Sequence, residues 1–270
     1  MKIVTFNVNG IRARLHQLQC LVETHHPDII ALQEIKCVND AFPFDAVREM
    51  GYQAEVFGQK GHYGVALLSK QKAVDVQFNF SGSDPQAQRR LIVGTYVDEQ
   101  KRPFVIMNGY FPQGESRDHP DKFPAKQKFY ADLTAYLNSD FKTSDNVLIV
   151  GDMNVAPDDL DVGIGEQNAK RWLKAGKCAF LPEEREWLQQ LVGWGLHDLY
   201  RELHPGSNER FSWFDYRSGG FEDYPKRGLR IDLVLGTSAL RKRCISAAID
   251  YEIRAMEKPS DHTPVIVEFS

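Results

Sequence analysis

The chain has 270 residues, of which 42% are hydrophobic and 11% aromatic, enough to bury one large core. Its formal net charge of −4 and its pI near 6.1 exclude a protein that coats nucleic acid by overall positive charge, but they allow a nucleic-acid enzyme with a local metal site. The four cysteines stand without CxxC spacing, which predicts reduced thiols rather than a disulfide framework or a zinc site.

Strand and helix patterns alternate along the chain with no linker, repeat or low-complexity tract, so we expect one domain over residues 1–270. Apolar residues at helical spacing predict helices over 11–26, from Pro124 to about 137, and from Pro182 onward. A turn is expected at 100–101. The meander of neighbouring strands indicates mixed or antiparallel sheets rather than strict βαβ winding. Runs of β-branched and aromatic residues predict strands over 2–8, 28–34, 52–57, 64–69, 91–97, 103–110, 148–151, 211–216, 229–235 and 264–269.

One of these strands ends in the motif Gly-Asp-Met-Asn, which contains Asp152 and Asn154. Two residues apart on an extended backbone, the two side chains point the same way. A carboxylate beside a carboxamide suits work on a phosphate ester, because one can activate a water and the other can donate to a phosphoryl oxygen. Taken alone, the motif is more typical of ordinary turn chemistry, and the catalytic interpretation depends on how many other strand ends carry the same kind of residue.

Other predicted strands also end or begin at polar residues. Asp232 is expensive to bury within so apolar a strand unless it is paired, and His262 is the candidate partner. Each of these residues has an ordinary structural explanation by itself. Gathered at one rim of a sheet they predict a phosphodiesterase site with a metal ion. Besides Asp152 and Asn154, the set consists of Asn7, Glu34, Tyr110, Asp232, Asp261 and His262.

Two segments carry an excess of positive charge. The loop over 117–128 has a modest excess, and the run over 170–177 has four basic residues, one Trp and no acid. A run of this kind is usually a solvated helix face. Phosphate binding is an alternative that the sequence leaves open.

In chain order, Asn7, Leu-Gln-Glu34, Gly-Asp152-Met-Asn154, Arg-Ile-Asp232 and Ser-Asp261-His262 resemble the endonuclease/exonuclease/phosphatase superfamily. The resemblance implies an α/β fold, a DNase I-like four-layered sandwich of two mixed β-sheets packed face to face and flanked by helices. Residues 58–66, 109–120, 211–218 and 256–262 resemble the bacterial exonuclease III family within it, and the similarity spans essentially the whole chain.

That family resemblance implies a double-strand-dependent 3′→5′ exodeoxyribonuclease of base-excision repair. Such an enzyme also incises at abasic sites and cleans blocked 3′ ends. The partner implied is double-stranded DNA, and a monomer is expected. The chain contains neither a signal-peptide pattern nor a run long enough for a membrane span, so we expect a cytoplasmic protein that binds no membrane.

The resemblance also implies a metal site for Mg²⁺ or Mn²⁺. Glu34 would hold the cation through oxygen with Asn7 next to it, and Asp261 would reach it through water. Asn9 stands where eukaryotic abasic endonucleases of the superfamily carry an Asp, so no metal contact is assigned to it.

Five catalytic roles carry over in the same way. Asp152 would orient and deprotonate the attacking water, helped by Asn154, which would also hold a phosphate oxygen. Asp232 would fix the tautomer of His262, which would donate to the phosphate as charge builds. Tyr110 would donate to the phosphate or stabilise the leaving oxygen.

The substrate contacts are expected in two groups. A pocket for a sugar without its base would be lined by Trp213, Leu229 and Ile231, for which ordinary packing is the alternative. The loop over 219–227 lies beside it and is slightly longer than the bacterial pattern, which bears on the balance between exonuclease action and abasic incision. Phosphate-backbone contacts without sequence preference are expected from Arg90, Gln113 and Arg117.

Two other functions fit the same set of residues. One is a phosphodiesterase acting on inositol phosphates or lipid headgroups, which the aromatic strand at 211–216 and the basic runs disfavour. The other is a catalytically silent DNA-binding scaffold, which the intact Glu34, Asp152 and His262 disfavour.

Overall fold

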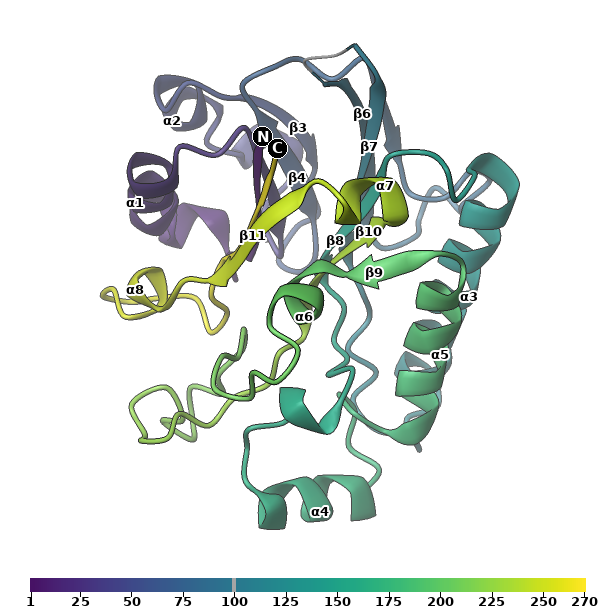
Figure 1. Ribbon diagram of the computed structural model, residues 1–270. Coiled ribbons are helices and arrows are strands. Elements are labelled where there is room, and N and C mark those ends of the chain that lie inside the picture. The colour runs from purple at the N-terminus through teal and green to yellow at the C-terminus, as the bar shows by residue number, and fades with distance from the viewer. Residues whose placement is uncertain (99–100) are drawn as a thin grey trace.

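The computed structural model describes residues 1–98 and 101–270 and forms the expected four-layered sandwich, in which two six-stranded sheets pack face to face between outer helices (Figure 1). The turn predicted at 100–101 falls partly outside the described residues. Among the described helices, none combines the length and the apolar character needed to cross a bilayer.

The first sheet has the strand order β11-β12-β1-β2-β4-β3, and the second has the order β5-β6-β7-β8-β10-β9. Both are mixed, as predicted, because β1/β2 and β7/β8 are parallel and the other neighbours are antiparallel. The first sheet comprises β1 (Lys2–Asn7), β2 (Ile29–Gln33), β3 (Gln53–Phe57), β4 (Val65–Ser69), β11 (Cys244–Ile249) and β12 (Val265–Phe269). The second comprises β5 (Asp75–Phe78), β6 (Leu91–Val97), β7 (Pro103–Tyr110), β8 (Val147–Asp152), β9 (Leu196–Asp198) and β10 (Asp232–Thr237).

Helices cover the two outer faces (Figure 1). Helices α1, α2 and α8 pack on the first sheet, and α3 and α5 pack on the second. The α-helices are α1 (Leu15–His25), α2 (Phe44–Glu49), α3 (Lys122–Asp140), α4 (Glu166–Lys174), α5 (Pro182–Gly193), α6 (Leu199–Leu203), α7 (Ser238–Arg241) and α8 (Tyr251–Arg254). The short 3₁₀ helices in the described part of the chain are η1 (Ile11–Ala13), η2 (Asn39–Ala41) and η3 (Asp159–Asp161).

The central strands are buried on both faces, which explains their unbroken apolar sequences. Their side chains alternate between the layer shared by the two sheets and the layer under the helices. Two buried amide side chains link the sheets across the shared layer, where Gln33 Nε2 donates to Asn108 Oδ1 at 2.7 Å. Asn108 Nδ2 in turn donates to the Leu32 and Ala66 carbonyls at 3.0 and 2.9 Å. These hydrogen bonds satisfy buried polar groups and join β7 to β2 and β4.

One predicted strand was wrong, and a second one starts later than predicted. Residues 211–216 form no strand, because Trp213 makes only isolated bridges, to Leu229 and His262, and the segment crosses between them. Its aromatic residues pack locally instead, with Phe211 and Phe214 against Phe221. The strand predicted over 229–235 begins only at Asp232. The short strands β5, β9 and β11 were not predicted.

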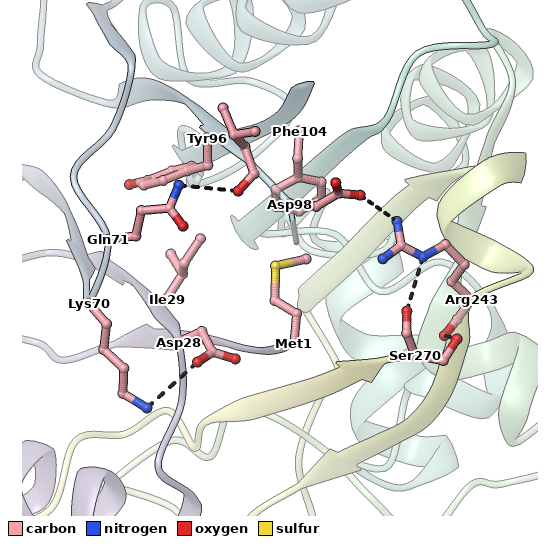
Figure 2. A pocket seen from close by; sticks show the side chains of 11 residues that line it. Met1, Asp28, Ile29, Lys70, Gln71, Tyr96, Asp98, Phe104, Arg243 and Ser270 are labelled. Atoms are coloured by element: carbon pink, nitrogen blue, oxygen red, sulfur yellow. Dashed lines mark hydrogen bonds and ion pairs between the residues drawn. The ribbon is translucent and has the colours of Figure 1, made fainter. Parts of the chain in front are cut away.

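The strand directions create one polar edge. The carboxyl ends of the parallel pairs β1/β2 and β7/β8 meet there, and the antiparallel partners β12 and β10 begin there. At the opposite edge a cavity of about 310 Å³ lies beside Met1, Ile29 and Phe104 (Figure 2). Its charged groups pair with each other, Lys70 with Asp28 and Arg243 with Asp98. The predicted site residues Glu34, Asp152 and His262 lie together at the polar edge and do not line this cavity.

Candidate active site

Strand register places the catalytic candidates of the second sheet side by side. Asp152 ends β8 directly opposite Tyr110 of β7 and Asp232 of β10. Gly151 allows this close approach, because a Cβ at its φ of 138° would lie 1.9 Å from the Gly109 carbonyl oxygen. The Gly of the Gly-Asp-x-Asn motif therefore serves strand packing, and the Asp that follows is held rigidly at the edge.

Asp152 is linked to the first sheet through Asn7. Asn7 Nδ2 donates to Asp152 Oδ2 at 2.9 Å and to Glu34 Oε1 at 3.1 Å. Burial, together with the neighbouring carboxylates of Asp232 and Glu34, raises the pKa of Asp152 to about 7, against the lowering effect of His262. A carboxylate with a pKa near neutrality is suited to accept a proton from water.

His262 and Asp232 form the predicted pair. The distance from His262 Nδ1 to Asp232 Oδ2 is 2.8 Å, and His262 Nε2 lies 3.6 Å from Asp152 Oδ2. Burial alone would lower the pKa of His262, but the carboxylates of Asp232 and Asp152 raise it to about 10. Since Nδ1 faces Asp232, a proton on Nε2 lies on the side of Asp152, from where it can be donated to a phosphate bound at the polar edge.

Asn154 lies directly behind Asp152, with its own backbone held on both sides. The backbone N–H of Asn154 donates to Asp152 Oδ1 at 3.0 Å, and its side-chain Nδ2 donates to the Phe111 carbonyl at 3.0 Å. Lys126 Nζ donates to the Asn154 carbonyl at 2.7 Å and pairs with Glu184, and both of these charged side chains are fully buried. The basic loop thus supplies a buried support rather than a free charge at Lys126.

Tyr110 lies beside Glu34 and contacts the guanidinium of Arg90, which also contacts the Tyr63 ring. The guanidinium of Arg90 lies 4.3 Å from the Tyr63 ring centroid and 4.8 Å from that of Tyr110, and its Nη1 donates to the Tyr110 carbonyl at 3.0 Å. Burial and the carboxylates of Glu34 and Asp152 raise the pKa of Tyr110 well above its ordinary value. The phenol therefore stays protonated and is available as a donor. Arg90 is only 8% exposed, a position that suits holding Tyr110.

Asp261 lies next to this group and is held by two other side chains. Asn9 Nδ2 donates to Asp261 Oδ1 at 2.8 Å, and Trp213 Nε1 donates to Asp261 Oδ2 at 3.1 Å. Lys36, which the sequence analysis did not consider, contacts Asn9 Oδ1 and lies 2.8 Å from Glu34 Oε2. Against the cost of burial, Lys36, Tyr110 and His262 keep the pKa of Glu34 below its ordinary value.

The donors at this edge fit a hard divalent cation. One ligand atom each from Glu34, Asp152 and His262 lies within 4.8 Å of the other two. Asp261 is not part of this group, and its oxygens are occupied by Asn9 and Trp213. The carboxylates of Glu34 and Asp152 supply the oxygen atoms that such cations prefer, while Asn7 donates from Nδ2 to both of them. Glu34, with φ 50°, and Asn154, with φ 52°, hold unusual backbone conformations of the kind that cluster at functional sites.

The expected substrate residues are spread around the site. Leu229 and Ile231 are 1% and 4% exposed and pack in a small core under Trp213. Gln113 is exposed, and Arg117 Nη2 donates to Glu183 Oε2 at 2.9 Å. These DNA contacts stay predictions. A cavity of about 170 Å³ opens beside Trp213 and is bounded by residues that the sequence analysis did not assign, among them Trp172, Ser218 and Arg227.

Sequence reasoning missed several supporting residues. Ser212 Oγ accepts from the amides of Ile231 and Asp232, both at 2.9 Å, and so fixes the start of β10. Arg230, 1% exposed, binds Asp161 and Asp198 at 2.7 Å each. The sequence offered a signal for Arg230, whose charge stands inside an apolar run, but none for Ser212.

Comparison with known proteins agrees with this geometry. The model of the Endonuclease/Exonuclease/phosphatase family matches residues 4–262. The chain belongs to this family. Within the Endonuclease/Exonuclease/phosphatase family, the chain is 52% identical over 269 residues to the exodeoxyribonuclease III of Haemophilus influenzae, with all of both chains covered.

Solved structures of the family superpose over the whole chain. A 3′ phosphatase from Neisseria bound to a product DNA hairpin gives a TM-score of 0.90 at 37% identity, covering 100% of this chain and 99% of the other. An AP endonuclease from Archaeoglobus fulgidus gives a TM-score of 0.90 at 33% identity with the same coverage. The predicted fold class and family are therefore confirmed.

The pairing of Asp232 with His262 can be tested directly. We expect Asp232→Asn to lower turnover by about two to four orders of magnitude, because the neutral amide no longer stabilises a charged imidazole. The melting temperature should change little, and the pH profile should shift. The matched control is Asp250→Asn. Asp250 Oδ2 lies 2.6 Å from His25 Nε2 in a second His–Asp pair outside the candidate active site. A fall in melting temperature with full activity would make the Asp232 pairing purely structural.

Proposed function

We propose that this protein is a Mg²⁺- or Mn²⁺-dependent DNA phosphodiesterase of base-excision repair. It removes nucleotides from the 3′ ends of duplex DNA, incises at abasic sites and cleans blocked 3′ ends. The observation that carries the proposal is the convergence of Glu34, Asp152 and His262 at one edge in a full-length relative of exodeoxyribonuclease III. The related 3′ phosphatase and AP endonuclease support DNA as the substrate.

The reaction is an in-line attack of water on the phosphorus atom. Asp152 accepts a proton from the water, and Asn154 beside it helps to orient the attack. His262, held by Asp232, donates a hydrogen bond from Nε2 to a phosphoryl oxygen as negative charge builds. Tyr110 donates from its phenol to the phosphate or to the leaving 3′ oxygen.

Glu34, with Asn7 beside it, would hold the divalent cation, which when bound supplies positive charge to offset that of the phosphate. Asp261, which accepts hydrogen bonds from Asn9 and Trp213, is proposed to contact the cation only through water. The ammonium of Lys36 also contacts Glu34 and keeps this carboxylate ionised. The residues of this chain thus keep a charged, oxygen-rich group ready at the open edge.

Abasic incision needs room for a sugar without its base. The cavity beside Trp213 is the place we assign to it, with Leu229 and Ile231 packed beneath the indole. Extruding such a nucleotide is easier because no base pair must be broken. Arg90, Gln113 and Arg117 are proposed to act around the neighbouring phosphates, Arg90 mainly by holding Tyr110.

A labelled duplex with one stable abasic analogue tests the proposal. The purified protein is incubated with the 5′-labelled strand in Mg²⁺ or in EDTA, and the products are resolved on a denaturing gel. We expect a Mg²⁺-dependent cut directly 5′ to the lesion and progressive shortening from the 3′ end. Gel filtration of the same sample checks the expected monomer.

The other outcomes are equally informative. Shortening without the cut would remove abasic incision from the proposal and direct attention to residues 219–227 beside the cavity. No product in either condition would refute DNA as the substrate and return inositol phosphates as the candidate.

A further inference from the structure

Helix α4 stands apart from the sandwich. Figure 1 shows it at the lower edge of the molecule, beyond the ends of the sheets. None of the residues from Glu166 to Lys174 is buried. Residues 166–177 contain four basic side chains and one acidic side chain. A projecting helix with this composition is a candidate for binding a partner of negative charge.

One face of α4 anchors it to the protein. Trp172 stacks on Phe180 with ring centroids 5.8 Å apart and an interplanar angle of 11°. The ammonium of Lys177 lies 3.5 Å from the Trp172 ring centroid. Ala169 and Trp172 pack against the small core that contains Leu229. The orientation of the helix is therefore fixed.

The opposite face is basic. At about 100° per residue, Lys170, Arg171 and Lys174 fall within a single arc of about 100°, centred on the side away from Ala169 and Trp172. Lys170 pairs with Glu166 at 2.5 Å, but both side chains are largely exposed, so water weakens this pair and leaves the charge available. We call Lys170, Arg171 and Lys174 the α4 basic face.

The α4 basic face reaches the cavity beside Trp213 through Arg171. Arg171 and Trp172 line this cavity of about 170 Å³ together with Trp213 and Arg227. Trp213 bridges through its backbone to His262. A duplex carries one negative charge per about 1.7 Å of its axis, so a substrate bound at His262 presents further phosphates to neighbouring basic groups.

We propose that the α4 basic face binds the phosphate backbone of duplex DNA away from the scissile bond and thereby strengthens the preference for double-stranded substrates. This inference rests on the proposed nuclease function. The contacts are electrostatic and read no bases, so they add affinity for any duplex sequence and increase its salt dependence.

The test is the triple variant Lys170→Gln/Arg171→Gln/Lys174→Gln in the full chain. We expect the Kd for a duplex with a recessed 3′ end, measured in EDTA, to rise at least about tenfold at moderate salt. The slope of log Kd against log salt should fall by up to about three, at about 0.9 per lost phosphate contact. The ratio of duplex to single-strand affinity should fall.

The matched control removes three exposed lysines at the opposite edge. Lys72, Lys101 and Lys242 are exposed and follow or precede strand ends remote from Asp152. Changing all three to Gln alters the net charge equally and should leave the Kd unchanged. The variant Lys170→Arg/Lys174→Arg, which keeps the charge, should bind as tightly as the wild type.

The outcomes separate the two proposals. A wild-type protein that does not act on DNA at all refutes the nuclease function itself. A wild-type nuclease whose triple variant keeps the same Kd, salt slope and strand preference, with an unchanged melting temperature, overturns the role of α4. An equal loss in the triple variant and in the control would mean overall charge rather than a docking face, which also overturns it.

Discussion

Asp152→Asn is expected to lower turnover on duplex DNA by about three orders of magnitude or more. The amide has the shape of the carboxylate but cannot accept a proton from water, and general-base action typically contributes a factor of about 10² to 10⁴. The change also weakens the interaction with His262 Nε2, which lies 3.6 Å away. Initial rates on a labelled duplex at saturating Mg²⁺ measure the loss.

The same variant should not be less stable. Burial and the carboxylates of Asp232 and Glu34 raise the pKa of Asp152 to about 7, so its ionised form is disfavoured in the folded state. At a pH between the unfolded and the folded pKa of Asp152, the carboxyl group is ionised in the unfolded chain but must take up a proton or remain a costly buried charge in the folded protein. Asparagine removes this cost, so the melting temperature at pH 7 should stay constant or rise. Asp132→Asn, which changes a surface carboxylate paired with Lys128 on α3, is the control. A stable Asp152→Asn protein with normal turnover would contradict the assignment.

Glu34→Gln is expected to weaken the response to Mg²⁺ at least about tenfold and to lower turnover at limiting Mg²⁺ by about two orders of magnitude. Glu34 offers a carboxylate at the open edge, and a neutral amide binds a hard cation less well. The backbone strain at φ 50° is the same in both proteins, and Asn7 can still donate to the amide oxygen. The comparison therefore isolates the charge.

Two measurements accompany this variant. Calorimetric titration with Mn²⁺ reports metal affinity without turnover, and the Kd for duplex DNA in EDTA should stay within about twofold. Glu268→Gln on β12 removes a carboxylate that is 41% exposed and only 3.9 Å from Lys2, and it should change neither quantity. An unchanged Mn²⁺ affinity in Glu34→Gln would assign the metal to other ligands.

The sequence alone carried much of the fold and most of the site. The central strands were predictable because both of their faces are buried, so their apolar runs are continuous and stop abruptly. Polar residues stood at those stops, and the convergence of Asn7, Glu34, Asp152 and His262 at one edge follows that expectation. The family motifs added their chain order.

Local pattern was misleading where tertiary contacts decide. The aromatic alternation at 211–216 is that of a strand, yet Trp213 is held by single bridges and by Asp261, and Phe211 and Phe214 pack against Phe221. The start of β10 depends on Ser212, about twenty residues away. Periodicity reports which side of a segment is buried, but it does not report which partner completes its hydrogen bonds.

The sequence by itself determined which residues are candidates, because their chemical type and their place after a buried run are local properties. Only the tertiary structure decided their partners. Asn7 meets Asp152 across 145 positions of chain, and Lys126 is a buried support for Asn154 rather than a surface charge. Ion pairs and hydrogen bonds between distant segments arise from sheet register and packing, and these are properties of the whole fold.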